Sequence, residues 1–173
     1  MLAASAAALS TLVLLASWAP SGTPFCGPGC IDRRLADLTA GDGSLPPARV
    51  AQAKALVRRQ LALSPFDASA WLRLAALEVV EGGGRLTPPA ARALERSYEF
   101  TPVDLRVARW RLRFAFDHWS EISPEVRASA MAELRSLLPD RKNYDALQGL
   151  DREITSPAGR LAYRLLFAQA PRP

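Results

Sequence analysis

Histidine, cysteine and lysine are scarce in this 173-residue chain. It has one histidine and two cysteines, and only two of its 22 lysine and arginine residues are lysines. His118 alone cannot supply a His-rich metal site, and no nucleophile motif accompanies it as a Ser-His-Asp triad would require. The chain also lacks a P-loop, the glycine motif of dinucleotide-binding proteins and the HExxH zinc motif. We therefore expect no metal, no cofactor and no catalytic residues.

The small excess of basic charge lies in residues 26–64, with six basic and three acidic side chains, and in residues 140–173, with six and four. The formal net charge is +5, yet residues 65–139 carry ten basic and ten acidic side chains. A nucleic-acid-binding protein would gather basic residues along one element or face. The charge distribution therefore predicts no nucleic-acid partner.

No charged residue precedes Asp32, and residues 2–19 form an apolar run, LAASAAALSTLVLLASWA. The run is just long enough to span a bilayer, and it ends in Ala-Pro-Ser-Gly, where a signal peptidase could act. We expect residues 1–22 to be a signal peptide or a membrane anchor. A buried core helix is a third interpretation, which the absence of a polar face disfavours.

A short linker over residues 23–30 contains two cysteines that indicate the cellular compartment in which the protein resides. Cys26 and Cys30 flank a Gly-Pro-Gly turn that could bring their sulfur atoms together, so we expect a disulfide and an oxidising compartment. Two unlinked thiols are the alternative. The charge order opposes export, because Arg33 and Arg34 follow the apolar run and no basic residue precedes it. We expect a body that is periplasmic or anchored to the inner membrane outside the cytosol, with a cytosol-facing body as the alternative.

Proline-containing markers divide the remaining chain into units of 37 residues. The first marker recurs at Pro65, Pro102 and Pro139. A second marker, Ser or Thr close before a proline, recurs within residues 44–47, 87–89 and 123–125. The hydroxyl of such a residue caps a helix and proline suits the first turn, so the second marker predicts helix N-termini.

Between the markers, apolar residues recur at steps of three and four, which is typical of helices. We expect helices near 31–39, 47–63, 67–81, 88–100, 103–118, 124–138 and 157–168. The polar stretch 140–155 is predicted to be a loop with at most one short helix. The predicted fold is all-α, with antiparallel helix pairs stacked over residues 31–139 after an N-terminal hydrophobic helix, and a loop and capping helix over 140–173.

This pattern resembles the tetratricopeptide-repeat family. The residues that match its motif are Pro65, Ala70, Trp71, Leu74, Ala75 and Pro102, although the unit is longer than the 34 residues of that family. The resemblance implies a scaffold that binds protein segments in a concave groove without catalysis. Such repeats behind a signal or anchor are similar to bacterial envelope proteins, including accessory proteins of polysaccharide export.

Three arginines are candidate binding residues. Arg106, Arg109 and Arg113 are spaced to share one face of the helix expected over 103–118, with Arg111 to the side. They could form an anion-binding stripe, or a solvated face paired with carboxylates of the preceding helix, Glu95 and Glu99; we favour the second interpretation.

Aromatic residues give further candidates. Tyr98 and Phe100 come at the end of the helix over 88–100, where they could line a groove, and Tyr98 joins the candidate partner-binding residues. The other aromatic side chains at helical spacing are predicted to fill the core. They are Phe66, Trp71, Trp110, Phe114 and Trp119.

Together these features predict a non-enzymatic protein–protein interaction module of the bacterial cell envelope. Its partner would be another envelope protein or a peptide segment, and residues 2–19 would hold it to the inner membrane if they are not cleaved. The alternative is a protein that binds an anionic polymer or lipid surface through its arginine-bearing helix face. The sequence does not predict an oligomeric state.

Overall fold

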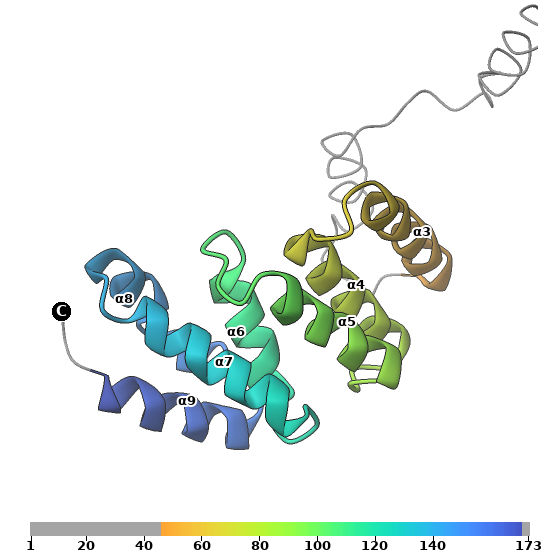
Figure 1. The fold of residues 1–173 in the computed structure, drawn as a ribbon. Coiled ribbons are helices and arrows are strands. Elements are labelled where there is room, and N and C mark those ends of the chain that lie inside the picture. Colours follow the sequence, from red (N-terminus) through yellow and green to blue (C-terminus); the bar gives the residue numbers. More distant parts are fainter. Residues whose placement is uncertain (1–45, 171–173) are drawn as a thin grey trace, which may run out of the picture.

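The computed structural model describes residues 46–170, which form helices joined by short turns (Figure 1). The helices are α3 (Pro47–Leu63), α4 (Ala68–Glu81), α5 (Pro88–Phe100), α6 (Ala108–Asp117), α7 (Pro124–Leu137), α8 (Arg141–Leu147), the 3-10 helix η1 (Leu150–Arg152) and α9 (Pro157–Gln169). No strand occurs within this described part, and the predicted all-α class is confirmed. The helix expected near 31–39, the apolar run and the cysteine pair lie outside the described residues.

Hydroxyl side chains cap three of the helices: α5 and α7 at the second marker, as predicted, and α9 at Ser156. Helix α3 starts at Pro47 as expected, but its N-cap is Pro46 and no side chain caps it, so the hydroxyl cap predicted there is wrong. The Thr87 side chain accepts a hydrogen bond from the backbone N–H of Ala90 at 3.3 Å, and Ser123 accepts one from Val126 at the same distance. Ser156 caps α9 in the same way. Each proline that follows stands in a first turn, where its missing N–H costs no helical hydrogen bond. The predicted starts of α5, α7 and α9 are therefore confirmed.

Helix α6 is shorter than predicted and begins at Ala108 instead of residue 103. The carbonyl oxygen of Asp104 accepts hydrogen bonds from the N–H groups of Val107 and Ala108, and its carboxylate accepts one from the N–H of Arg106 at 3.0 Å. These bonds stabilise a separate turn before the helix. Arg106 therefore precedes α6 and does not share a helix face with Arg109, which corrects the predicted three-arginine stripe.

The stretch 140–155 is more helical than predicted. Asp140 caps α8 by accepting a hydrogen bond from Asn143 N–H at 3.0 Å, and η1 follows after Gly149. Gly149 has a φ of 82°, a left-handed conformation that glycine adopts without steric cost. The two short helices were not predicted because the stretch is mostly polar. Each nevertheless buries a leucine, Leu147 in α8 and Leu150 in η1.

The helices pack into one continuous core. Helix α4 packs most extensively against α5 and also against α3, while α6 contacts α9 and α7, and α5 contacts α7. Figure 1 shows α3, α4 and α5 at one end and α6 to α9 at the other. The buried apolar cluster runs from Val50 on α3 to Tyr163 on α9 and includes both groups. Among residues 46–170, no helix combines the length and hydrophobicity needed to cross a bilayer.

Candidate functional site

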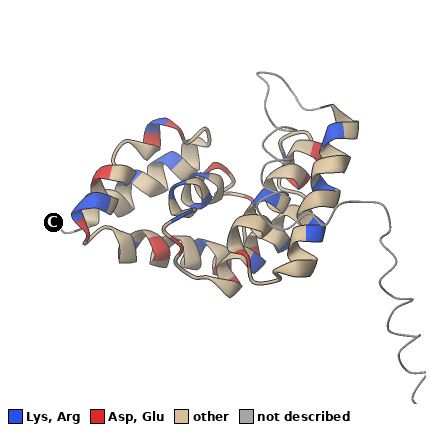
Figure 2. Cartoon of the chain, turned by 90° about the horizontal axis from the view of Figure 1, so that it is seen from above, with Lys and Arg blue, Asp and Glu red and all other residues tan. Residues whose placement is uncertain are grey.

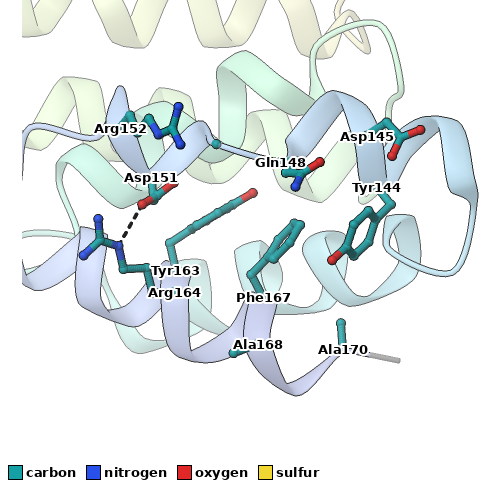
Figure 3. A pocket seen from close by; sticks show the side chains of 11 residues that line it. Tyr144, Asp145, Gln148, Asp151, Arg152, Tyr163, Arg164, Phe167, Ala168 and Ala170 are labelled. Carbon is teal, nitrogen blue, oxygen red and sulfur yellow. Dashed lines mark hydrogen bonds and ion pairs between the residues drawn. The ribbon is translucent and has the colours of Figure 1, made fainter. Parts of the chain in front are cut away.

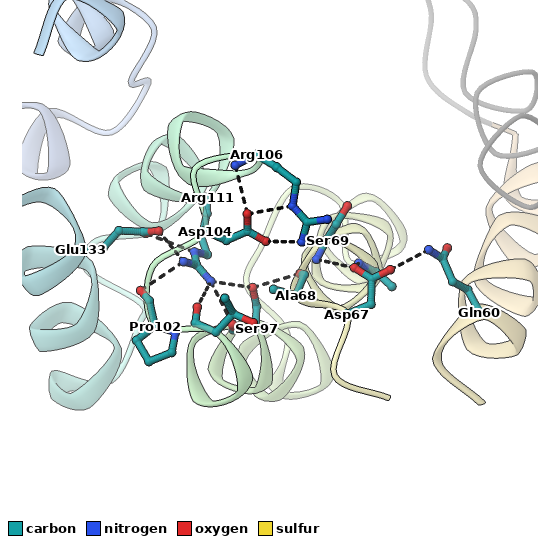
Figure 4. Close-up of polar contacts among 12 residues, drawn as sticks. Gln60, Asp67, Ala68, Ser69, Ser97, Pro102, Asp104, Arg106, Arg111 and Glu133 are labelled. Atoms are coloured by element: carbon teal, nitrogen blue, oxygen red, sulfur yellow. Dashed lines mark hydrogen bonds and ion pairs between the residues drawn. The ribbon is translucent and has the colours of Figure 1, made fainter. Parts of the chain in front are cut away.

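A buried arginine joins the two groups of helices. The Arg111 side chain on α6 is fully buried, and its Nη1 donates hydrogen bonds to the carbonyl oxygens of Ser97 at 2.9 Å and Thr101 at 2.8 Å (Figure 4). Its Nη2 donates to the carbonyl of Pro102 at 3.2 Å, and its Nε donates to Glu133 on α7 at 3.1 Å. This side chain therefore links α5, α6 and α7, and its role is structural.

Tyr98 belongs to this buried cluster. It is only 4% exposed, and the guanidinium carbon of Arg111 lies 4.3 Å from the centre of its ring. Burial, followed by the neighbouring Glu133 carboxylate, holds the pKa of the Tyr98 hydroxyl well above its usual value. Tyr98 therefore packs in the interior and does not line a surface groove, which corrects the expectation for this residue.

The exposed arginines of the predicted stripe are all engaged by local carboxylates. Arg106 pairs with Asp104 at 2.9 Å, and this hydrogen bond lowers the pKa of that carboxyl. Arg109 and Arg113 both pair with Glu153, across from α6. The carboxylates are therefore not the expected Glu95 and Glu99. Figure 2 shows basic and acidic residues interspersed over the helices, in keeping with this local pairing.

A groove lies between α3, α4 and α5, with a volume of about 290 Å³. We call it the basic groove, because three arginines line it together with one carboxylate, Glu78. Arg58 comes from α3, whereas Arg92 and Arg96 come from successive turns of α5. The other lining residues are Trp71, Leu74, Pro89 and Ala93. The groove therefore combines an apolar floor with guanidinium groups from two helices.

The carboxylate of this groove, Glu78, is ion-paired, but one of its arginines, Arg92, has no ion pair within the described residues. Lys54 Nζ lies 2.8 Å from Glu78, and Arg58 lies 3.4 Å from the same carboxylate. Burial lowers the pKa of Lys54, but its hydrogen bonds to Glu78 and Glu81 outweigh burial and raise it. Arg92 forms no ion pair with any residue between 46 and 170. The groove can thus offer an unpaired guanidinium to an incoming anion.

Aromatic side chains, of which Phe66 is exposed and Trp71 and Phe100 are partly buried, continue the basic groove at one end. The Trp71 ring lies 6.2 Å from that of Phe100, which packs edge-on against Phe66 at 5.1 Å. The guanidinium of Arg96 lies 5.8 Å from the Phe100 ring. Phe66 is 70% exposed, so the prediction that it fills the core is wrong; Trp110, at 39%, is likewise only partly covered. We call Phe66, Trp71 and Phe100 the aromatic end of the groove.

A second, larger cleft of about 770 Å³ lies between α8, η1 and α9 (Figure 3). Tyr163 and Phe167 form its floor, and Tyr144 packs against Phe167 with ring centres 4.8 Å apart. Arg164 and Asp151, both on its wall, pair with each other at 2.7 Å. Its aromatic rings thus pack on one another, and two of its wall charges neutralise each other.

Metal-ligating side chains do not cluster in the part of the chain that the structure describes. No group of three or more His, Cys, Asp or Glu side chains there could hold a metal ion. His118 ends α6, and its Nδ1 lies 3.0 Å from a carboxylate oxygen of Glu121. This contact suits a residue that closes a helix, as its position in the sequence predicts.

Comparison with known proteins finds no matching family model, no similar curated protein and no similar solved structure. Function is therefore inferred from the geometry of the basic groove.

Proposed function

We propose that this protein is a non-enzymatic binding module that holds an extended segment of a partner protein in the basic groove. One observation carries the proposal. The groove, bounded by three helices, combines the unpaired guanidinium of Arg92 with an apolar floor and an aromatic end in which Phe66 is exposed. An apolar pocket with a few polar groups at its rim is the usual form of a site that recognises a ligand by shape and charge.

The ion pairing of the arginines favours the basic groove over the arginine-bearing face as the site. Arg106, Arg109 and Arg113 are each held by carboxylates of the same chain, so an anionic polymer or membrane would have to compete with them. In the basic groove, Arg92 has no such competitor among the described residues. Binding of a polymer or lipid surface through Arg106, Arg109 and Arg113 is therefore the less favoured function.

The wider setting of this module is also a proposal. Helix pairs of the tetratricopeptide-repeat type would suit a scaffold that displays such a groove. The apolar run at residues 2–19 supports export to a bacterial cell envelope, with the body outside the cytosol and another envelope protein as the partner. Envelope assembly, including polysaccharide export, is the class of process that would use it.

Site-specific photo-crosslinking in the cells that make the protein tests this function. A photoreactive phenylalanine at position 89, an exposed groove residue whose replacement leaves Arg92 in place, should form an adduct whose mapped peptide is one contiguous segment of one partner protein. The same residue at position 135, exposed on α7 and outside the groove, is the matched control and should give little adduct. Equal yields at both positions, or none at position 89, would contradict the proposal.

A further inference from the structure

We infer that the segment bound in the basic groove carries acidic residues at alternate positions beside one aromatic or large aliphatic side chain. This inference rests on the proposed function and adds the chemistry of the partner. It follows from three features of the groove: the arginines that remain available, their spacing, and the aromatic rings that adjoin them.

The available positive charge lies on α5. Glu78 is already shared by Lys54 and Arg58, which leaves Arg92 and Arg96 to face a ligand. Arg96 pairs with Glu99 at 2.6 Å, but both side chains are about half exposed. Exposed pairs of this kind contribute little, so a ligand already held by the unpaired Arg92 can replace Glu99 at Arg96. The arginine-bearing face offers no unpaired arginine from which such an exchange could begin. Guanidinium groups bind carboxylates through two parallel hydrogen bonds, which makes carboxylates the fitting partners.

The spacing of these two arginines sets the spacing of the acids. Arg92 and Arg96 lie four residues apart on α5, so they project from one face, about 6 Å apart along the axis. In an extended segment, alternate side chains point the same way and lie roughly 6.6 Å apart. Acidic residues at positions i and i+2 of the segment would therefore face Arg92 and Arg96 together.

The aromatic end supplies the site for an apolar anchor. Phe66 is 70% exposed, and Leu63 and Val103, which lie three residues from Phe66 and Phe100 along the chain, are 49% and 42% exposed. Trp71 lies both in the groove and beside Phe100, so the apolar surface continues directly from the arginines. Buried aromatic or aliphatic anchors commonly dominate the affinity of small interfaces. An anchor here would cover the exposed ring of Phe66 and the exposed parts of Trp71 and Phe100.

Fluorescence anisotropy with the full chain and three labelled ten-residue peptides tests the inference. The probe has one phenylalanine followed by three glutamates separated by serines; the companions carry glutamines for the glutamates, or serine for the phenylalanine. We expect each companion to bind about tenfold more weakly than the probe. Arg92→Ala should weaken binding of the probe about threefold, and Phe66→Ser should do so to a similar extent. Arg135→Ala should leave it unchanged.

The outcomes separate this inference from the proposed function. Equal affinity for the glutamate and glutamine peptides, with both weakened by Arg92→Ala, would overturn the acidic preference and leave the groove as the site. Absence of probe binding would overturn the inference, while adducts from position 89 would still support a groove-bound partner. If heparin or anionic vesicles bind with dependence on Arg92 but not on Phe66, the ligand is a polyanion and the inference is wrong.

Discussion

Replacing Arg111 by alanine is expected to lower the free energy of unfolding by about 3–5 kcal/mol, because it leaves the fully buried Glu133 carboxylate without its partner. The change also removes the donors that satisfy the carbonyl oxygens of Ser97, Thr101 and Pro102. Buried acceptors without donors add to the cost. Urea unfolding followed by circular dichroism at 222 nm measures the effect, and a variant already unfolded without urea agrees with it.

Arg113→Ala is the matched control, since Arg113 lies on the same helix but is 45% exposed and pairs only with exposed or partly exposed carboxylates. This substitution should lower the free energy of unfolding by less than about 1 kcal/mol. The double variant Arg111→Met, Glu133→Leu should recover part of the loss, because no charge then remains buried alone. Equal urea midpoints for Arg111→Ala and Arg113→Ala would contradict the structural role of Arg111.

The change Gly159→Ala is expected to destabilise the protein by about 3 kcal/mol, although alanine normally stabilises a helix relative to glycine. A Cβ atom at Gly159 would lie 1.7 Å from the carbonyl oxygen of Phe116, so α9 would have to move away from α6. The obstructing atom belongs to the backbone, which cannot turn aside as a flexible side chain can. Thermal unfolding measures the change.

Ala158→Gly tests the sign of this prediction at the neighbouring, exposed position of α9. It should cost roughly 0.5–1 kcal/mol through helix propensity alone. The two positions should therefore show opposite preferences, with glycine favoured at 159 and alanine favoured at 158. A melting temperature raised by Gly159→Ala would show that α9 does not pack closely on α6.

The local rules of helix formation were enough to place most helices. Thr87, Ser123 and Ser156 each cap the helix that the sequence predicts. Such a cap can be predicted because the hydroxyl binds the N–H of a residue only three positions later. The start of α6 was missed because Asp104 stabilises a turn of its own, whereas Asp67, one unit earlier, caps α4 directly. The two sites have the same residue type, and their difference lies in the residues that follow.

The roles of individual arginines could not be predicted, because burial depends on elements distant in the sequence. Arg109, Arg111 and Arg113 alternate along α6, and the middle one is structural because it contacts Ser97, Thr101, Pro102 and Glu133. The basic groove was missed for the same reason. Arg58 and Arg92 stand 34 residues apart and meet only after α3, α4 and α5 pack.

The side-chain indole signals of the tryptophans test the central claim, that the basic groove is the binding site, most directly. Trp71 lines the groove and donates its indole N–H to the Pro65 carbonyl at 2.8 Å, whereas Trp110 and Trp119 lie on or beside α6. Titration of the phenylalanine–glutamate peptide into isotope-labelled full-length protein, followed by nuclear magnetic resonance, should shift the Trp71 signal and leave those of Trp110 and Trp119 in place. An unchanged Trp71 signal beside a shifted Trp110 or Trp119 signal would place binding elsewhere and contradict the account.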